Sequence, residues 1–206
     1  MKVIVFGASG KTGALVVEKA KAAGHEVTAF MHGADEKPPV GVRAVSGDAG
    51  DAEAVRRAVA GHDAVIDTIG GTTPWKDSGL EETAAKAIIA AMKAEGVRRL
   101  LVISAAGVGG SDTQVSFAYA HLLMPTMLRG AVKDKGRMEG QVEESGLDFV
   151  IARPALLSDD PEDGTLKVVP EPGKAHHTRR GDLAKFLVSQ LTSDEHLGQA
   201  VVVAND

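Results

Sequence analysis

The chain of 206 residues contains no cysteine, and aromatic residues make up only 3% of it. Without cysteine there are no disulfides, no thiolate nucleophile and no cysteine-ligated metal site. The few aromatic side chains leave little surface on which nucleic-acid bases could stack, and a formal net charge of -5 argues against binding to a phosphate backbone. We therefore expect no nucleic-acid partner.

Long hydrophobic runs are also missing, because no apolar stretch approaches the roughly 18 residues that a membrane span requires. The run from Val3 to Phe6 follows Met1 and Lys2 directly, without the apolar segment of a cleavable signal. Hydrophobic residues nevertheless account for 44% of the chain, which is enough for a core. We expect a cytoplasmic protein with no membrane partner, folded as a single domain over residues 1–206.

Short apolar runs alternate with helical patterns along the chain. The run from Val3 to Phe6 precedes a glycine-rich loop and a helical pattern that ends at Gly24, and Glu26 to Phe30 forms the next run. Residues 42–45 predict a short extra strand. Further runs, at residues 62–66, 99–103 and 148–151, each come shortly after a glycine. Strands of nearly continuous Val, Ile and Leu that alternate with helices predict an α/β fold, a mainly parallel sheet with helices on both faces.

Weaker signals complete this expectation. The pair Ser78 and Glu81 predicts a capped helix start. A helical segment from Gln114 is interrupted at Pro125, so we expect a bend or two helices there. The last part of the chain contains turns, short strands and one helix that Asp182 would cap. We interpret it as a small C-terminal elaboration on the substrate side of the domain.

A glycine motif, Gly7-x-x-Gly10-x-x-Gly13, lies between the first strand and the first helix. Glycines at such a turn let the backbone approach a pyrophosphate, whose charge is met by free amides and by the helix dipole. The motif could be a tight structural turn, but its place between a strand and a helix favours a dinucleotide site. The residues predicted to bind this cofactor are Gly7, Ser9, Gly10, Lys11, Thr12 and Gly13.

The end of the second strand indicates which nicotinamide cofactor is expected. An Asp or Glu there would bind the free ribose hydroxyls of NAD, but this sequence has His32. Without that carboxylate a 2′-phosphate meets no repulsion, and Lys11 and Lys37 offer positive charge nearby. We predict NADP as the cofactor, with NADPH preferred over NADH. The alternative is that both lysines are solvated surface charges.

Several segments, in order, resemble the atypical short-chain dehydrogenase/reductases of the NmrA-like group. They are the glycine motif, residues 90–97, Ser104-Ala105 and the stretch from Glu144 to Pro154. Within this group the sequence is most similar to the biliverdin reductase B or flavin reductase type. The resemblance implies a Rossmann-type, doubly wound sheet and an oxidoreductase that binds NAD(P)H.

The resemblance also implies roles for residues at the strand ends. Ser104 is similar to the active-site serine, and Lys135 to the lysine that binds the nicotinamide ribose; both are predicted catalytic and cofactor-binding residues. The backbone of Pro154 and Ala155 would meet the nicotinamide. Ser104 could instead be a turn residue, and Lys135 a surface lysine. Further cofactor contacts are expected where glycines allow close approach or where the family packs beside the adenine: Asp48, Thr68, Gly70 and Gly71.

The tyrosine that donates a proton in ordinary short-chain dehydrogenases is missing. It would stand four residues before Lys135, where this sequence has Ala131, and the lone Tyr119 lies beyond Pro125. An alkoxide formed from a ketone needs a positioned acid, whereas a conjugated acceptor delocalises the charge. We therefore predict an NADPH-dependent reductase of a flavin, quinone or biliverdin-like acceptor. The alternatives are a redox sensor that binds NAD(P) without turnover and a sugar-nucleotide epimerase, although epimerases depend on that same tyrosine.

Three further residues attract attention. Trp75 follows the paired glycines and could cover the acceptor ring or mark an oligomer contact. His176 and His177 are adjacent, but no third ligand stands at a short spacing, so we expect no metal site. The expected partner is a small-molecule acceptor, and the expected assembly is a monomer or a small homo-oligomer.

Overall fold

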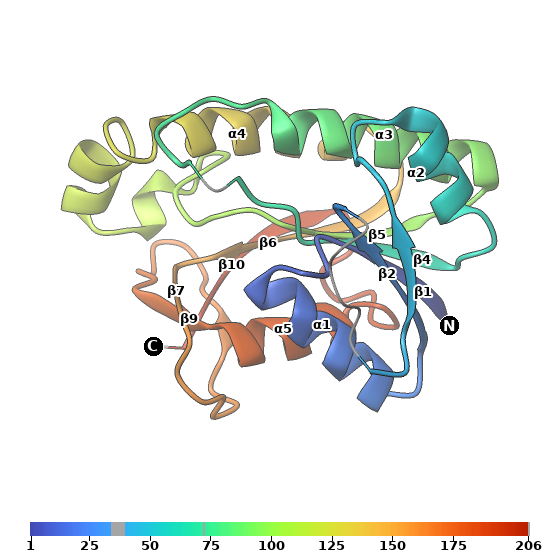
Figure 1. Cartoon of the computed structure of the whole chain (residues 1–206). Coiled ribbons are helices and arrows are strands. Elements are labelled where there is room, and N and C mark those ends of the chain that lie inside the picture. Colours follow the sequence, from blue (N-terminus) through green and yellow to red (C-terminus); the bar gives the residue numbers. More distant parts are fainter. Residues whose placement is uncertain (34–39, 72, 206) are drawn as a thin grey trace.

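One eight-stranded sheet forms the middle layer of the computed structural model, which describes residues 1–33, 40–71 and 73–205 (Figure 1). The strand order is β3-β2-β1-β4-β5-β6-β10-β8, and β8 runs antiparallel to β10. A separate parallel pair joins β7 to β9. The strands are β1 (Lys2–Phe6), β2 (Glu26–Met31), β3 (Arg43–Ser46), β4 (Ala64–Asp67), β5 (Arg99–Ile103), β6 (Asp148–Pro154), β7 (Leu156–Ser158), β8 (Lys167–Val168), β9 (His177–Arg179) and β10 (Gln199–Ala204).

Helices cover both faces of this sheet. The helices α2, α3 and α4 lie on one face, and α1 and α5 lie on the other (Figure 1). None of the helices in the described part of the chain is long and apolar enough to cross a membrane. The helices are α1 (Lys11–Ala22), α2 (Ala52–Val59), α3 (Leu80–Glu95), α4 (Arg129–Glu143) and α5 (Arg180–Ser189). The predicted Rossmann-type, doubly wound α/β fold is confirmed, and β7 and β9 belong to its C-terminal elaboration.

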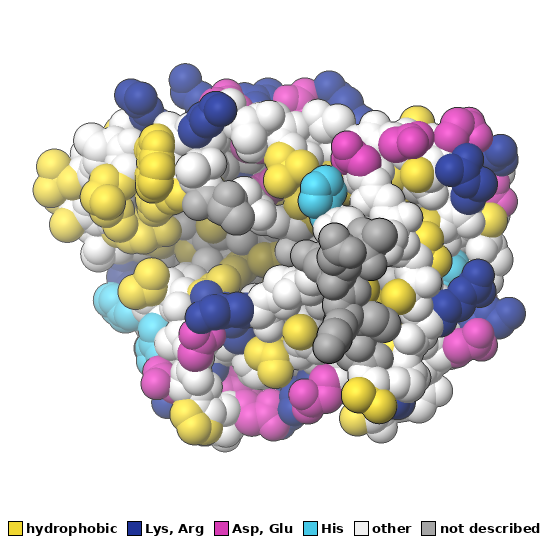
Figure 2. All heavy atoms as spheres, viewed as in Figure 1, with side chains coloured by type: hydrophobic (Ala, Val, Ile, Leu, Met, Phe, Trp, Pro, Cys, Tyr) yellow, Lys and Arg dark blue, Asp and Glu magenta, His cyan; other side chains and the backbone are white. Residues whose placement is uncertain are grey.

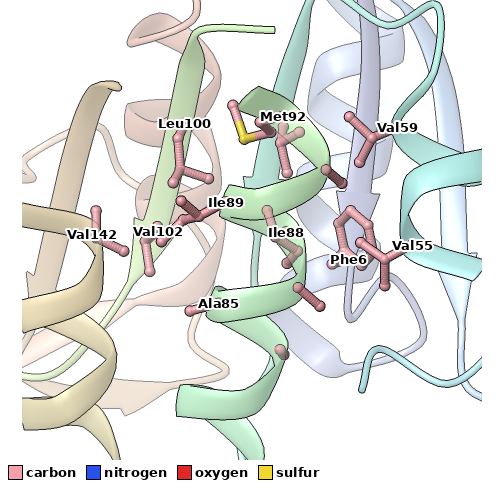
Figure 3. Close-up of a cluster of buried hydrophobic side chains, with 14 of the residues drawn as sticks. Phe6, Val55, Val59, Ala85, Ile88, Ile89, Met92, Leu100, Val102 and Val142 are labelled. Atoms are coloured by element: carbon pink, nitrogen blue, oxygen red, sulfur yellow. The ribbon is translucent and has the colours of Figure 1, made fainter. Parts of the chain in front are cut away.

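Two buried hydrophobic clusters hold the helices on the sheet. Side chains from α2, α3 and the strands meet on one face, among them Phe6, Val55, Ile88 and Met92 (Figure 3). Successive residues of a strand point to opposite faces. In β5, Val102 belongs to the cluster under α3 and α4, whereas Ile103 belongs to the cluster under α1 and α5. This alternation determines the face on which each residue at a strand end lies.

The two predicted helix caps are wrong. Ser78 and Glu81 form no capping box, because Asp134 of α4 accepts the backbone N–H groups of Glu81 and Glu82 at 3.2 and 2.9 Å. Asp182 does not cap α5, since its carboxylate accepts two backbone N–H groups from the loop that precedes it. In both places a contact between distant segments replaces the local hydrogen bond that the sequence pattern suggested.

The segment between β5 and α4 also differs from the prediction. Gln114 starts no long helix, because its side-chain Nε2 donates to the carbonyl of Val169 at 2.7 Å. A 3-10 turn, η1 (Ser111–Gln114), is followed by a π-helical turn, η2 (Tyr119–Leu123), and α4 begins only at Arg129. The predicted separation into two pieces is confirmed, with Pro125 in the turn between them.

Glycines inside α4 provide a test of this packing. A Cβ on Gly130 would lie 2.2 Å from the carbonyl carbon of Lys76, whereas a Cβ on Gly140 would meet nothing within 4 Å. Glycine in a helix interior costs about 0.5–1 kcal/mol relative to alanine. We expect Gly140→Ala to raise the free energy of unfolding in urea by about that amount and Gly130→Ala to lower it. Equal effects of the two substitutions would contradict the placement of α4.

Candidate functional site

A cavity of about 920 Å³ lies where β1 and β4 end. These neighbouring strands flank the point at which the strand order reverses, and open α/β sheets bind ligands there. The lining of this cavity contains the residues that were predicted from the glycine loop and from the ends of β2, β3 and β4. They are Gly7, Ser9, Gly10, Lys11, Thr12, Gly13, His32, Asp48, Thr68, Gly70 and Gly71.

The glycine loop packs against the end of β4 so closely that side chains are excluded. Gly7 has a φ of +73°, and a Cβ there would lie 2.9 Å from backbone atoms of Thr68. A Cβ on Gly13 would lie 2.1 Å from the carbonyl oxygen of Gly7. The Thr68 hydroxyl donates to the carbonyl of Phe6 at 2.7 Å, which ties the two strand ends together. The fold therefore requires glycine at positions 7 and 13.

The N-terminus of α1 opens into the same cavity. Its N-cap residue is Gly10, its first turn carries no acidic side chain, and no side chain of the described residues caps it. Lys11 and Thr12 of this first turn line the cavity. Unpaired N–H groups and the positive end of the helix dipole favour an anion at such a position. The cradle fits the pyrophosphate of a dinucleotide.

Positively charged side chains stand at the rim of this cavity. Lys11 Nζ lies 2.6 Å from Asp159 Oδ2, and Arg180 Nη1 lies 2.5 Å from Asp159 Oδ1. These cations lower the pKa of Asp159, chiefly through the hydrogen bond from Lys11. Arg180 lines the cavity although the sequence carried no signal for it. His32 is exposed at the end of β2, and Lys37, predicted to act beside it, lies outside the described residues.

Apolar side chains that the sequence reasoning missed form walls of the cavity. They are Phe30, Ala49, Ile69, Leu80 and Leu157. The ring of Phe30, in β2, packs against that of Phe6, in β1, with a centroid distance of 4.5 Å. This contact holds the Phe30 side chain in place as one wall of the cavity. Asp48 accepts the N–H of Gly50 at 2.8 Å, so it closes a turn and also lines the cavity.

The residues predicted to take part in the chemistry lie beside this cavity rather than in its lining. Ser104 is 3% exposed, and its hydroxyl has no hydrogen-bond partner in the described part of the chain. Because it follows Val102 by two positions in extended backbone, it lies on the face that α4 and Lys135 cover. Pro154 ends β6, and Ala155 lines a separate, smaller cavity.

Buried charges connect Lys135 to the backbone that follows β4. Lys135 Nζ lies 2.7 Å from Glu81 Oε2, whose other carboxylate oxygen accepts the N–H of Gly71 at 3.2 Å. The Glu81 side chain is 3% exposed and that of Lys135 is 14% exposed, so Lys135 is not a solvated surface lysine. Burial raises the pKa of Asp67, at the end of β4, to about 7, against the lowering effects of the Ile69 N–H and of Lys135. Neither carboxylate was predicted as a site residue, and Glu81 was expected only in a helix cap.

The other residues singled out by the sequence lie elsewhere. Trp75 is 57% exposed and lines a hollow of about 370 Å³ with Arg129 and Lys133, not the cofactor cavity. His176 lines the smaller cavity beside Ala155. Within residues 1–33, 40–71 and 73–205, no group of three or more His, Asp or Glu residues could hold a metal ion.

Known proteins resemble this chain over most of its length. The chain is 29% identical over 200 residues to a Bacillus subtilis protein named "Uncharacterized sugar epimerase YhfK", a match that covers 93% of this chain and 88% of that protein. It is 26% identical over 183 residues to the uncharacterized chloroplastic protein At2g34460 of Arabidopsis thaliana. That match covers 82% of this chain but only 64% of the Arabidopsis protein.

Solved structures share the fold. ChuY, described as an anaerobillin reductase from Escherichia coli O157:H7, has a TM-score of 0.83 and 26% identity, with 100% of this chain and 97% of ChuY covered. A short-chain dehydrogenase/reductase from Veillonella parvula in complex with NADP has a TM-score of 0.82 at 18% identity, with 98% and 94% covered. A family model described as NAD(P)H-binding matches residues 7–194. Together with the dinucleotide cradle, this match shows that the chain belongs to the NAD(P)H-binding family.

Proposed function

We propose that this protein is an NADPH-dependent reductase that transfers hydride to a conjugated acceptor, such as a flavin, a quinone or a biliverdin-like tetrapyrrole. The observation that carries the proposal is Ala131, which stands four residues before Lys135 where a ketone reductase of this fold needs its acid. Ala131 lies in the first turn of α4, and its N–H donates to the carbonyl of Pro74 at 2.9 Å. A methyl side chain cannot protonate an alkoxide there.

Two observations support a conjugated acceptor: the chemistry of hydride transfer and the name of a similar protein. A conjugated ring system delocalises the charge that hydride transfer creates, so its reduction depends less on an acid at the position of Ala131. ChuY, which is similar to this chain over its whole length, is named an anaerobillin reductase. An epimerase, the activity in the name of the Bacillus subtilis relative, would instead need the tyrosine base that Ala131 replaces.

Some residues of the site would bind the cofactor, and others would orient the nicotinamide and the acceptor. The N-terminus of α1, with Lys11 and Arg180, would bind the phosphates, and the cofactor supplies the hydride. Lys135, held by Glu81, would bind the nicotinamide ribose. The buried Ser104 hydroxyl, which has no partner among the described residues, would donate a hydrogen bond to the acceptor.

Spectrophotometry with purified protein tests the proposal directly. NADPH is mixed with FMN, menadione or biliverdin, and we expect the NADPH absorbance to fall with at least one acceptor. Ser104→Ala should reduce this rate. Tight binding that distinguishes NADPH from NADP, without turnover of any acceptor, would contradict the reductase and support a redox sensor.

Cofactor preference gives a second prediction. We expect NADPH to bind more tightly than NADH, and Lys11→Gln to weaken NADPH binding by about tenfold, because a charge-assisted hydrogen bond contributes about 1.5 kcal/mol or more. Asp159→Asn should tighten NADPH binding, since it removes the carboxylate that engages Lys11 and Arg180. Calorimetry measures each dissociation constant. Lys21→Gln, which removes the same charge from the far end of α1, is the matched control. A preference for NADH would overturn this assignment.

A further inference from the structure

A second cavity, of about 110 Å³, lies where β5 and β6 end. The pairing with β6 continues past the end of β5, because Ser104 N donates to Ala152 O and Ala106 N donates to Pro154 O, both at 2.8 Å. Ala106 and Ala155 both line the cavity. It therefore opens directly on the strand ends at which the acceptor is expected.

A buried hydroxyl, that of Ser104, lies two positions before Ala106 of the cavity lining, which also contains Ser116. Ser104 N and Ala106 N donate to alternate carbonyls of β6, as successive residues of a paired strand do, which places their two side chains on the same face of the sheet. The Ser104 hydroxyl is buried and has no hydrogen-bond partner in the described part of the chain. A buried hydroxyl without a partner costs free energy unless a ligand or water satisfies it, which indicates a ligand on this face.

Tyr119, the only tyrosine of the chain, lines this same cavity. It lies in η2, outside α4, and packs against a buried cluster that includes Ala106, Val115 and Ala175. Its hydroxyl makes no hydrogen bond to another described residue. Burial raises the pKa of its phenol, so the proton stays on the oxygen at neutral pH. The other titratable side chain in the lining is His176.

Apolar surface surrounds this position. Tyr119 also lines an outer groove of about 440 Å³ with Leu122 and Leu123. Phe117 and Leu122 are 75% and 65% exposed, and Leu156, in the lining of the small cavity, is 68% exposed. Figure 2 shows hydrophobic side chains gathered at the end of the molecule that carries η2. A planar, largely apolar ring system suits such walls.

We infer that Tyr119 is the proton donor of the reaction, a role that rests on the proposed reductase function. The acceptor gains a hydride, with its electron pair, from the dihydronicotinamide and a proton from the Tyr119 hydroxyl. The proton goes to the acceptor oxygen or nitrogen on which negative charge develops. Water then returns a proton to the phenolate, so that one NADPH, one acceptor and one proton yield NADP and the reduced acceptor. This donor lies on η2, outside α4, so it does not take the place of the tyrosine that a ketone reductase carries four residues before its lysine.

Two acceptors of different charge test this role. Menadione needs a proton when it accepts hydride, whereas the N-methylacridinium cation becomes neutral by accepting hydride alone. We expect Tyr119→Phe to slow single-turnover reduction of menadione by about 10²-fold or more, the usual effect of a general acid. The same variant should leave the rate with N-methylacridinium and the dissociation constant of NADPH unchanged. Ser189→Ala, which removes a hydroxyl from α5 on the opposite face of the sheet, is the matched control.

A measurement without turnover complements the kinetics. Because the chain has one tyrosine, protein labelled with ¹³C at the tyrosine Cζ gives a single resonance. We expect this resonance to shift when menadione binds in the presence of NADP, and to keep its position when NADP binds alone.

Each other outcome has a definite meaning. An unchanged menadione rate in Tyr119→Phe, or equal losses with both acceptors, would refute the donor role while the reductase function stands. A loss specific to menadione in His176→Gln, with Tyr119→Phe unaffected, would also refute it. If the wild-type protein reduces neither acceptor nor FMN nor biliverdin, the proposed function itself fails.

Discussion

Gly13→Ala is expected to weaken NADPH binding by at least about a hundredfold, which corresponds to about 2.8 kcal/mol. A Cβ at this position would lie 2.1 Å from the carbonyl oxygen of Gly7 and 2.7 Å from Thr68 Oγ1. Alanine has no rotamer with which to escape, and the nearest clash is with backbone. The first turn of α1 would therefore have to move away from β1, and its N–H groups would leave the place where they meet the pyrophosphate.

Calorimetry with NADPH measures this loss, after circular dichroism has shown that the variant retains its fold. Gly140→Ala controls for the change of glycine to alanine as such, because its Cβ meets nothing within 4 Å and it lies on α4, away from the glycine loop. Gly10→Ala gives an intermediate case, since its Cβ would lie 3.3 Å from the same Gly7 carbonyl oxygen. An unchanged dissociation constant in Gly13→Ala would show that this loop does not hold the cofactor.

The sheet and the glycine loop could be predicted because their signals are local. Buried parallel strands are continuous apolar runs, and even the short strand predicted at 42–45 is present as β3, Arg43–Ser46. All loop residues from Gly7 to Gly13 except the buried Ala8 line one cavity, because a strand, a turn and a helix in succession place them there. The strand-end residues Thr68 and Gly70 follow from the topology of the sheet in the same way.

The errors arose where a distant segment overrides a local pattern. Glu81 has the spacing of a capping box, yet its carboxylate binds Lys135 and the Gly71 N–H, while Asp134 satisfies the helix N-terminus instead. Gln114 was expected to begin a helical segment, yet its side chain donates to the carbonyl of Val169. A hydrogen-bond partner more than fifty residues away cannot be predicted from a local pattern of four residues.

The missed site residues share the same cause. Arg180, the first residue of α5, and Leu157, in the three-residue strand β7, reach the cofactor cavity from the C-terminal elaboration, where no sequence motif marked them as site residues. Tyr119 looked remote from Lys135 because helical geometry was the only available rule, whereas the fold carries it on η2 to the strand ends. Only the number of tyrosines, one, marked it in the sequence.

The buried carboxyl of Asp67 leads to the second large expected effect. Asp67→Asn should change the stability difference from the wild type by roughly 4 kcal/mol between pH 4 and pH 8, in favour of the variant at the higher pH. The pKa of this carboxyl is raised from 3.8 to about 7, chiefly by burial. Each unit of pKa corresponds to about 1.36 kcal/mol. The Asn oxygen can still accept the Ile69 N–H, which lies 3.0 Å from Asp67 Oδ1.

The sign follows from where the proton resides. Well below pH 3.8 the carboxyl is protonated in both the folded and the unfolded chain, so its burial adds little electrostatic cost, and near pH 4 about half of the unfolded chains have lost this proton. Between the unfolded value and about 7, only the folded chain holds the proton, and the stability of the wild type falls as the pH rises. Above about 7 both states are ionised and the full cost is present. Asparagine is neutral throughout, so the advantage of the variant grows with pH and then levels off.

Urea denaturation of both proteins from pH 4 to pH 8 measures this difference, and Asp148→Asn gives a control of opposite sign. The hydrogen bond from Arg98 lowers the pKa of Asp148, so its charge stabilises the fold at neutral pH and Asn at that position removes this contribution. Because Asp67 is coupled to Lys135, ionisation of Asp67 should also alter NADPH affinity near pH 7 in the wild type and not in Asp67→Asn. A stability difference independent of pH would mean that Asp67 ionises freely in the folded chain, and it would separate this carboxyl from the charge state of the site.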